Sequence, residues 1–215
     1  MRITYLIITL SLIFSLSHNS FSQGCSDAGV CTMDFNDHSD VVKRNQLSAS
    51  IIYGKADHSI NATTLSLEYQ HIHPVLGLLS IKVSGSSISG SSLSNSGLSD
   101  IFLSGSSKVA QNLSILYGVK IPLNDGNSQK ENKTLPLDLQ TSLGTFDVYA
   151  GMKIDVDRFA FTLAYQTPLS NSSNTFLPSL YSSSSEFASY TPTKNFKRKA
   201  DLVGRIDFVG NVSET

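Results

Sequence analysis

The sequence predicts an all-β protein: an antiparallel up-and-down transmembrane β-barrel in which about eight strands are visible. Two observations predict this fold class. Apolar and polar residues alternate with a period of two in a series of segments, most of them about ten residues long, the length that a tilted membrane-spanning strand needs. The connections between these segments also alternate between short and long. After the first residues, no helical period of useful length occurs.

The alternation is clearest in residues 145–168, which read TFDVYAGMKIDVDRFAFTLAYQTP. A tight turn at Val156-Asp157-Arg158 divides this stretch into two strands. Each strand has one apolar face and one polar, partly charged face, and the apolar face touches either the inside of a soluble protein or lipid. The lipid-facing candidates are Val148, Met152, Phe159, Phe161, Leu163 and Tyr165.

The predicted strands follow one another along most of the chain. They lie near residues 46–55, 62–73, 77–86, 99–109, 112–122, 144–156, 158–168 and 199–209. An outer-membrane barrel alternates in this way because one face of each strand meets lipid and the other meets a polar interior. The candidates for the polar, lumen-facing set are Glu68, Gln70, Lys82, Lys120, Asp147, Lys153, Asp155, Arg205 and Asp207.

The connections differ in length according to their position in the chain. Those after the second, fourth and sixth strands are tight, whereas the later odd-numbered ones, at residues 86–98, 123–142 and 169–199, are long. Outer-membrane barrels have short periplasmic turns and longer extracellular loops, so this asymmetry fits a periplasmic N-terminus. A soluble sandwich gives no strong reason for such alternation. We expect the serine-rich loops to be solvated, flexible surface.

Aromatic residues near the predicted strand ends suit the interfacial girdles of a membrane barrel. They are Tyr53, Tyr69, Phe102, Tyr117, Phe146, Phe159 and Tyr165.

The first residues read as an export signal. Arg2 precedes an apolar run that is too short to span a bilayer, and small residues at Ser20 and Ser22 predict cleavage before Gln23. We therefore expect a signal peptide at 1–22, a periplasmic segment at 23–45 and the barrel domain at 46–215. The alternative is a lipoprotein anchored through Cys25, although Ser22 stands where a leucine-like residue is usual.

The two cysteines, Cys25 and Cys31, lie just after the predicted cleavage site. Because an exported chain meets an oxidising compartment, a disulfide across this short loop is a reasonable expectation. Two cysteines alone cannot form a tetrahedral metal site.

Composition and motifs exclude several classes of function. The net charge of -1 gives no basic footprint for nucleic acid, and the mean hydropathy of -0.02 excludes a multi-helix membrane protein. No nucleophile elbow, phosphate-binding loop, dinucleotide fingerprint or zinc-protease motif occurs, so we predict no enzyme and no cofactor. His71 and His73 could hold a metal, but a pair at a turn is the commoner explanation, and Asp125-Gly126-Asn127 reads as a turn.

Several short motifs resemble one family of outer-membrane barrels, labelled as meta-pathway phenol degradation proteins or simply as transporters. They are Gly97-Leu98-Ser99-Asp100 at the start of a strand, Lys120-Ile121-Pro122 followed by Asn124-Asp125-Gly126, and the run from 135 to 147. The resemblance covers about residues 23–210. It departs from the family at Ser106-Ser107-Lys108 and in the final DFVGNVSET, which lacks a terminal aromatic residue. It implies a channel for small solutes, with hydrophobic or aromatic compounds as the class that the family label carries.

The sequence therefore predicts an outer-membrane channel for passive permeation, with membrane lipid and a small-molecule solute as partners. Two alternatives remain: a non-transporting surface barrel whose long loops bind a partner, and a soluble secreted β-sandwich. Family members are generally longer, so two alternatives stay open: the barrel closes at eight strands, or the chain is an incomplete part of a larger barrel. At eight strands the inner charges would form a buried ion-pair network, whereas in a wider barrel they would line a lumen. The oligomeric state stays open.

Overall fold

The computed structural model describes residues 45–56, 59–90, 93–181, 187–188, 190–194 and 196–208. The predicted signal peptide, the Cys25–Cys31 pair and the predicted periplasmic segment up to residue 44 lie outside these residues. Within the described part of the chain, no helix is long and apolar enough to cross a membrane.

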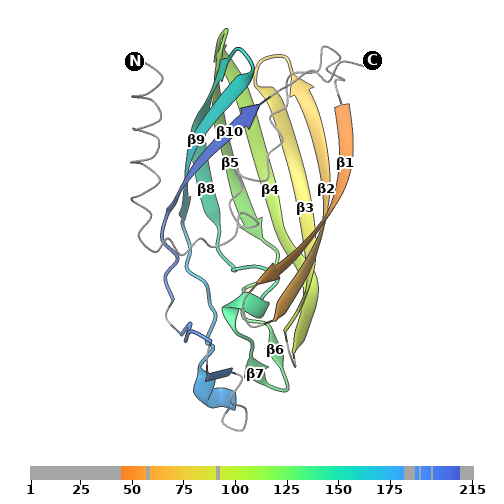
Figure 1. Ribbon diagram of the computed structural model, residues 1–215, viewed down its shortest axis with the longest axis vertical. Helices are drawn as coiled ribbons and strands as arrows, with labels where there is room; N and C mark the ends of the chain where they lie inside the picture. Colours follow the sequence, from red (N-terminus) through yellow and green to blue (C-terminus); the bar gives the residue numbers. More distant parts are fainter. Residues whose placement is uncertain are drawn as a thin grey trace, which may run out of the picture.

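Eight strands form one antiparallel sheet, as the sequence predicted, and each pairs with its neighbours in chain order (Figure 1). They are β1 (Asn45–Ala56), β2 (Ile60–His73), β3 (Gly77–Ser89), β4 (Ser94–Ala110), β5 (Leu113–Pro122), β8 (Asp147–Val156), β9 (Phe159–Pro168) and β10 (Asp201–Phe208). The remaining elements are a small hairpin of β6 (Gln129–Lys130) and β7 (Lys133–Thr134) and two single 3-10 turns, η2 (Leu137–Leu139) and η3 (Pro178–Tyr181). The all-β, up-and-down fold class is confirmed.

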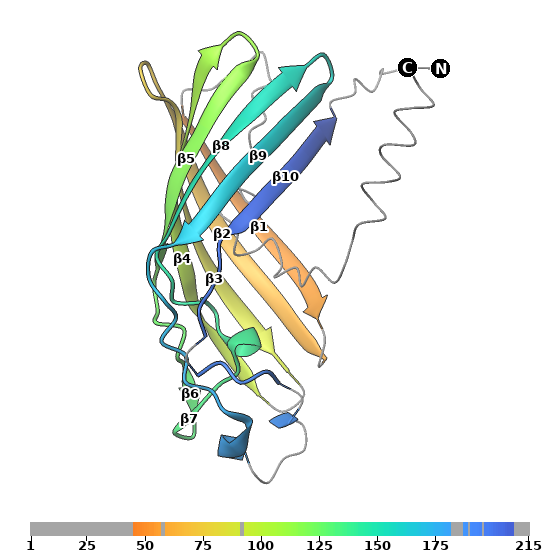
Figure 2. The ribbon, with the colours of Figure 1, turned by 90° about the vertical axis from the view of Figure 1, so that its left-hand side faces the viewer.

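The large sheet curls into half of a barrel, with β1 and β10 at its two edges (Figures 1 and 2). The tight turns between β2 and β3, β4 and β5, and β8 and β9 lie together at one end, which we call the turn end. The long connections lie at the opposite end, the loop end.

The register separates the side chains into two faces of opposite character. One row on the concave side, the inner face, runs from Glu68 through Lys82, Phe102 and Lys120 to Asp147. The convex side, the outer face, is apolar and exposed over most of its extent. Its exposed residues include Leu65, Leu67, Ile81, Leu103, Ile115, Met152, Ile154, Phe161, Leu163, Leu202 and Ile206.

The predicted loop at residues 86–98 is mostly strand, which corrects the sequence prediction. β3 continues to Ser89 and β4 begins at Ser94. The register of this strand pair shifts between Val83 and Gly85, and the pairing continues beyond the shift to Ser89 and Ser94. Serine side chains support this extension, because Ser86 bonds to both Thr64 and Ser99. Backbone hydrogen bonds between β3 and β4 do not need alternating apolar side chains. The hydrophobic pattern therefore ends before the paired part of the β3–β4 hairpin does.

The other two long connections fold together over the loop end. We call residues 123–146 and the described part of 169–200 the cap (Figure 2). Its centre is the larger hydrophobic cluster of the described chain, which also takes in one end of β2 and of β3. The cluster consists of Ile60, Ile88, Leu135, Leu139, Phe176, Tyr181, Phe187 and Tyr190. The described loop residues are therefore not merely solvated surface, because four aromatic rings among the serines supply a buried core.

Side-chain amides join the two halves of the cap. Asn174 Nδ2 donates to the carbonyl oxygens of Gly126 at 2.8 Å and of Leu135 at 3.2 Å. The predicted turn is present, since Asn124 Oδ1 accepts from the Gly126 backbone N–H and Asp125 Oδ1 accepts from that of Asn127. This turn therefore also binds Asn174, which belongs to the other long connection of the cap.

Candidate functional site

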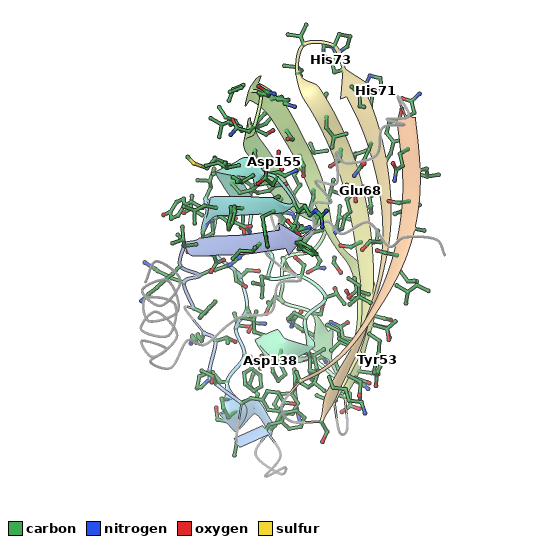
Figure 3. The ribbon with its side chains drawn as sticks, turned by 45° about the horizontal axis from the view of Figure 1, so that its top comes forward. Tyr53, Glu68, His71, His73, Asp138 and Asp155 are labelled. Atoms are coloured by element: carbon green, nitrogen blue, oxygen red, sulfur yellow. The ribbon has the colours of Figure 1, made fainter. Side chains whose placement is uncertain are left out.

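The structure places the nine predicted polar candidates on one face. Glu68, Gln70, Lys82, Lys120, Asp147, Lys153, Asp155, Arg205 and Asp207 all lie on the inner face, by their register and burial. Figure 3 labels Glu68 and Asp155, which belong to strands on opposite sides of the half-barrel. The face has three zones, at its loop end, its middle and its turn end.

At the loop end, a buried cluster of charges surrounds Asp147. Its Oδ2 atom accepts from Gln166 Nε2 at 2.6 Å and from Arg198 Nη1, and lies 3.5 Å from Lys120 Nζ. Lys120 and Asp147 are fully buried, and Arg198 is nearly so. Thr145 accepts from Lys120 at 3.2 Å.

Arg198 connects this cluster to the cap. It lies in the connection that precedes β10, and its Nη2 atom donates to Asp201 Oδ2 at 2.6 Å. One guanidinium therefore ties the cap to β8 through Asp147 and to β10 through Asp201. The geometry suits arginine because its planar fork can hold two carboxylates at once.

The middle of the inner face combines charge with aromatic rings. Lys82 Nζ lies 5.6 Å from the centre of the Phe102 ring, a cation–π contact, and Lys82 pairs across the strands with Glu68. Tyr149 lies flat along the wall, where Gly118 leaves room for its ring, and its hydroxyl is 2.5 Å from Ser104 Oγ. The Tyr149 ring thus lies against the inner face of the neighbouring strand instead of projecting away from the sheet.

At the turn end there are two further ion pairs, of which the Arg205–Asp207 pair is the more open. Lys153 Nζ lies 3.3 Å from Asp155 Oδ1, and Arg205 Nε donates to Asp207 Oδ1 at 2.7 Å. The Arg205 side chain is 28% exposed, whereas that of Arg198 is 3% exposed. The Arg205–Asp207 pair is therefore more open to solvent than the Asp147 cluster, whereas the Lys153 side chain, which is 6% exposed, is buried as that cluster is.

The predicted lipid-facing residues lie on the outer face. Met152, Phe159, Phe161, Leu163 and Tyr165 are exposed, and Val148 is half-buried on the same side. Phe159 also contacts Phe208 of β10, with ring centres 5.2 Å apart.

Of the predicted girdle residues that lie in strands, one does not lie on the outer face, and Phe146 precedes β8. Phe102 is 2% exposed and lies on the inner face under Lys82, because its parity matches that of the charged row. Tyr117 does lie outside, where its ring covers Gly105 and its hydroxyl donates to the Leu76 carbonyl oxygen at 3.2 Å.

The two histidines at the turn end have structural partners. His73 Nδ1 accepts from the backbone N–H groups of Val75 and Leu76 at 3.2 Å each, and His71 Nδ1 lies 2.7 Å from Asn45 Oδ1 (Figure 3). Among the residues that the structure describes, no three His, Cys, Asp or Glu side chains come together as metal ligands.

Sequence reasoning missed three contributors to the Asp147 cluster. Gln166 lies on the polar parity of its strand and could have been found by alternation alone. Thr145 and Arg198 lie outside the strands, where no period applies. Only the folding of the cap brings Arg198 to Asp147.

No protein-family model, curated protein or solved structure matches this chain.

Proposed function

We propose that the protein is an integral outer-membrane barrel protein that lets small solutes permeate passively. The observation that carries the proposal is the character of the two faces of the sheet, which is the reverse of that in a soluble β protein. The outer face of the curled sheet is apolar and exposed, and the inner face carries charges of both signs. This is the arrangement of a membrane barrel, in which lipid covers the outside and the interior is polar.

A soluble β-sandwich would need the opposite arrangement. Its apolar face would pack against a second sheet and its charged face would meet water. Here Ile51, Leu202 and Ile206 are each about 70% exposed, and they belong to a face that extends from β1 to β10. Soluble monomers rarely expose continuous apolar surface of this extent, so the outer face favours a lipid environment.

The inner face supplies a path with two unlike ends. The turn end has the partly exposed Arg205–Asp207 pair, and the cap covers the loop end. Mixed charge along the path predicts weak preference between cations and anions. The resemblance to channels for hydrophobic or aromatic compounds supports testing such compounds first, together with small ions.

The proposal is tested on the full chain with paired cysteine variants in a Cys25→Ser/Cys31→Ser background. Phe161→Cys reports on the outer face, and its neighbour Thr162→Cys is the matched control on the inner face. In outer-membrane fractions, a lipid-soluble thiol reagent should label Phe161→Cys and a water-soluble reagent should not. Equal labelling of Phe161→Cys by the water-soluble reagent would reject the membrane assignment.

Conductance in a planar lipid bilayer then separates a channel from a non-transporting surface barrel. The purified protein should migrate differently on a gel before and after boiling, as closed barrels do, and should conduct ions across the bilayer. A membrane-bound, heat-modifiable protein that never conducts would reject permeation while retaining the barrel.

A further inference from the structure

One short stretch of the chain gathers positive charge at the loop end. The connection at residues 169–200 contains four cations and one acidic residue, Glu186, whereas the connection at residues 123–146 contains two cations and three acidic residues. The four cations lie within six residues of sequence just before β10: Lys194, Lys197, Arg198 and Lys199. In Figure 2 this stretch belongs to the dark blue trace that leads from the cap into β10.

The four cations have different surroundings. Arg198 belongs to the Asp147 cluster and is nearly fully buried, whereas the three lysines are exposed. We call Lys194, Lys197 and Lys199 the lysine patch. Asp201, the nearest acidic residue in the sequence, is bonded to Arg198. The lysine patch therefore presents positive charge outward.

The fold fixes the backbone that carries the lysine patch. The Thr193 backbone N–H donates to the Phe176 carbonyl oxygen at 3.1 Å, and the Phe196 N–H donates to the Thr193 carbonyl oxygen at 2.9 Å. Between Lys197 and Lys199, Arg198 is bonded to β8 and to β10. A partner of the lysines therefore has less chain to order than it would on a free loop.

The lysine patch lies at the loop-end border of the apolar outer face. Leu202 in β10 and Leu169, directly after β9, are 72% and 64% exposed. Lys199 precedes Leu202 by three residues, a span of at most about 11 Å. The headgroup region beyond each side of the hydrocarbon core is about 5–8 Å thick, and lysine extends its charge on a long apolar stem. Ammonium groups here can therefore reach the headgroups of a leaflet whose hydrocarbon covers the two leucines.

The opposite border has no comparable surface. The tight turns at residues 74–76, 111–112 and 157–158 contain one acidic and one basic residue, Asp157 and Arg158, whose charges cancel. Arg158 and Lys108 are exposed cations at this turn end. They therefore provide a control for the loss of positive charge far from the lysine patch.

We propose that the lysine patch is a docking surface for the negatively charged headgroups of anionic lipids in the leaflet at the loop end. This inference rests on the proposed function, because only a membrane around the outer face brings headgroups to this level. A basic residue near an anionic bilayer surface gains enough attraction for about 5-fold enrichment of its partner. The proposal concerns the residues before β10 and the outer face beside them, so it does not depend on how many strands complete the ring.

Site-specific quenching tests the proposal on the full chain in a Cys25→Ser/Cys31→Ser background. A fluorophore is attached at Ala200→Cys, an exposed position next to Lys199. The protein is reconstituted in phosphatidylcholine vesicles that contain a small fraction of quencher lipid, either phosphatidylglycerol or phosphatidylcholine with a nitroxide near the start of one acyl chain. The ratio of the two quenching efficiencies reports which lipid gathers beside the lysine patch.

Phosphatidylglycerol should be enriched about 5-fold or more at Ala200→Cys, and Lys194→Gln/Lys197→Gln/Lys199→Gln should make the two lipids quench equally. Lys108→Gln/Arg158→Gln should leave the preference intact. Equal quenching in the unsubstituted protein would overturn the proposal, and so would a preference that survives loss of the three lysines. Because all three side chains are exposed, the triple variant should keep its heat-dependent gel migration.

Salt distinguishes lipid headgroups from free phosphate as the partner. Sodium chloride and sodium phosphate of equal ionic strength should weaken the preference equally, since both act by screening. A stronger effect of phosphate would overturn the proposal by identifying a site for the free anion.

The Phe161→Cys labelling described above separates this inference from the proposed function. Lipid-protected Phe161→Cys with equal quenching by the two lipids would retain the membrane barrel and reject the docking surface. Water-accessible Phe161→Cys, with quenching by neither lipid, would reject the membrane assignment and this inference with it.

Discussion

The loop end and the turn end of the inner face carry the same kinds of residue in different surroundings. Each has an arginine bonded to an aspartate: Arg198 with Asp147 under the cap, and Arg205 with Asp207 near the tight turns. The first pair is almost wholly removed from solvent, and about a quarter of each side chain in the second is exposed. The comparison teaches that the cap, and not the strand pattern, decides which of the two arginine–aspartate pairs is buried.

The largest effect should come from the core of the cap. Phe176 is fully buried and contacts the rings of Tyr181 and Tyr190. Phe176→Ala should cost about 3–5 kcal/mol in the free energy of cap unfolding, because it removes buried surface and leaves a cavity. Limited proteolysis should then cut within residues 169–200 while the sheet stays resistant. Leu180→Ala, at a residue that is 40% exposed, is the matched control and should change little.

The two arginines give the next comparison. Arg198→Gln should lower the free energy of unfolding by about 3 kcal/mol, since it leaves a buried carboxylate with fewer partners. Lys120 and Gln166 still reach Asp147, which keeps the cost near the lower end of the usual range. Arg205→Gln should cost less than about 1 kcal/mol, because water can replace the lost partner. Urea unfolding followed by circular dichroism measures both, and equal losses would contradict the distinction between the ends.

Two glycines compare the packing on the two faces of the sheet, since Gly118 lies on the inner face and Gly204 on the outer face. A Cβ atom at Gly118 would lie 2.4 Å from the Tyr149 ring and 2.6 Å from the Leu103 carbonyl oxygen. Gly118→Ala should therefore destabilise the sheet by about 1–3 kcal/mol through overpacking. Gly204→Ala meets nothing within 4 Å and should be close to neutral. A neutral Gly118→Ala in the same urea titration would show that Tyr149 does not lie against the wall.

The smallest effect concerns pH and the cap. Burial raises the pKa of the Tyr181 hydroxyl above its usual 10.0, and the nearby Glu131 carboxylate adds to the shift. In the unfolded cap the phenol ionises first, so this contribution is complete below pH 10 and is lost as the pH rises through the folded-state pKa. Protease resistance of the cap should fall in that alkaline range. Tyr181→Phe should weaken this dependence, and an unchanged profile would refute it.

Alternation made the strands predictable because one side of each strand meets a different medium from the other. The register of Glu68, Lys82, Lys120 and Asp147 follows directly from that parity. The cap was not predictable, because Phe176 and Tyr190 are scattered among serines without any period and meet only through tertiary packing. Arg198 was missed for the same reason. The end of β3 was missed because serines sustain a ladder without hydrophobic contrast.

The cap joins parts of the chain that lie far apart in sequence, and this fixes when it can form. Each strand of the sheet pairs with the next in chain order, so hairpins can add one after another by closing short loops. The cap core must bring Ile60, at the start of β2, to Tyr190, just before the last strand. Contacts of such long sequence separation form late. A newly made chain would therefore have its sheet in place while its loop end was still uncovered.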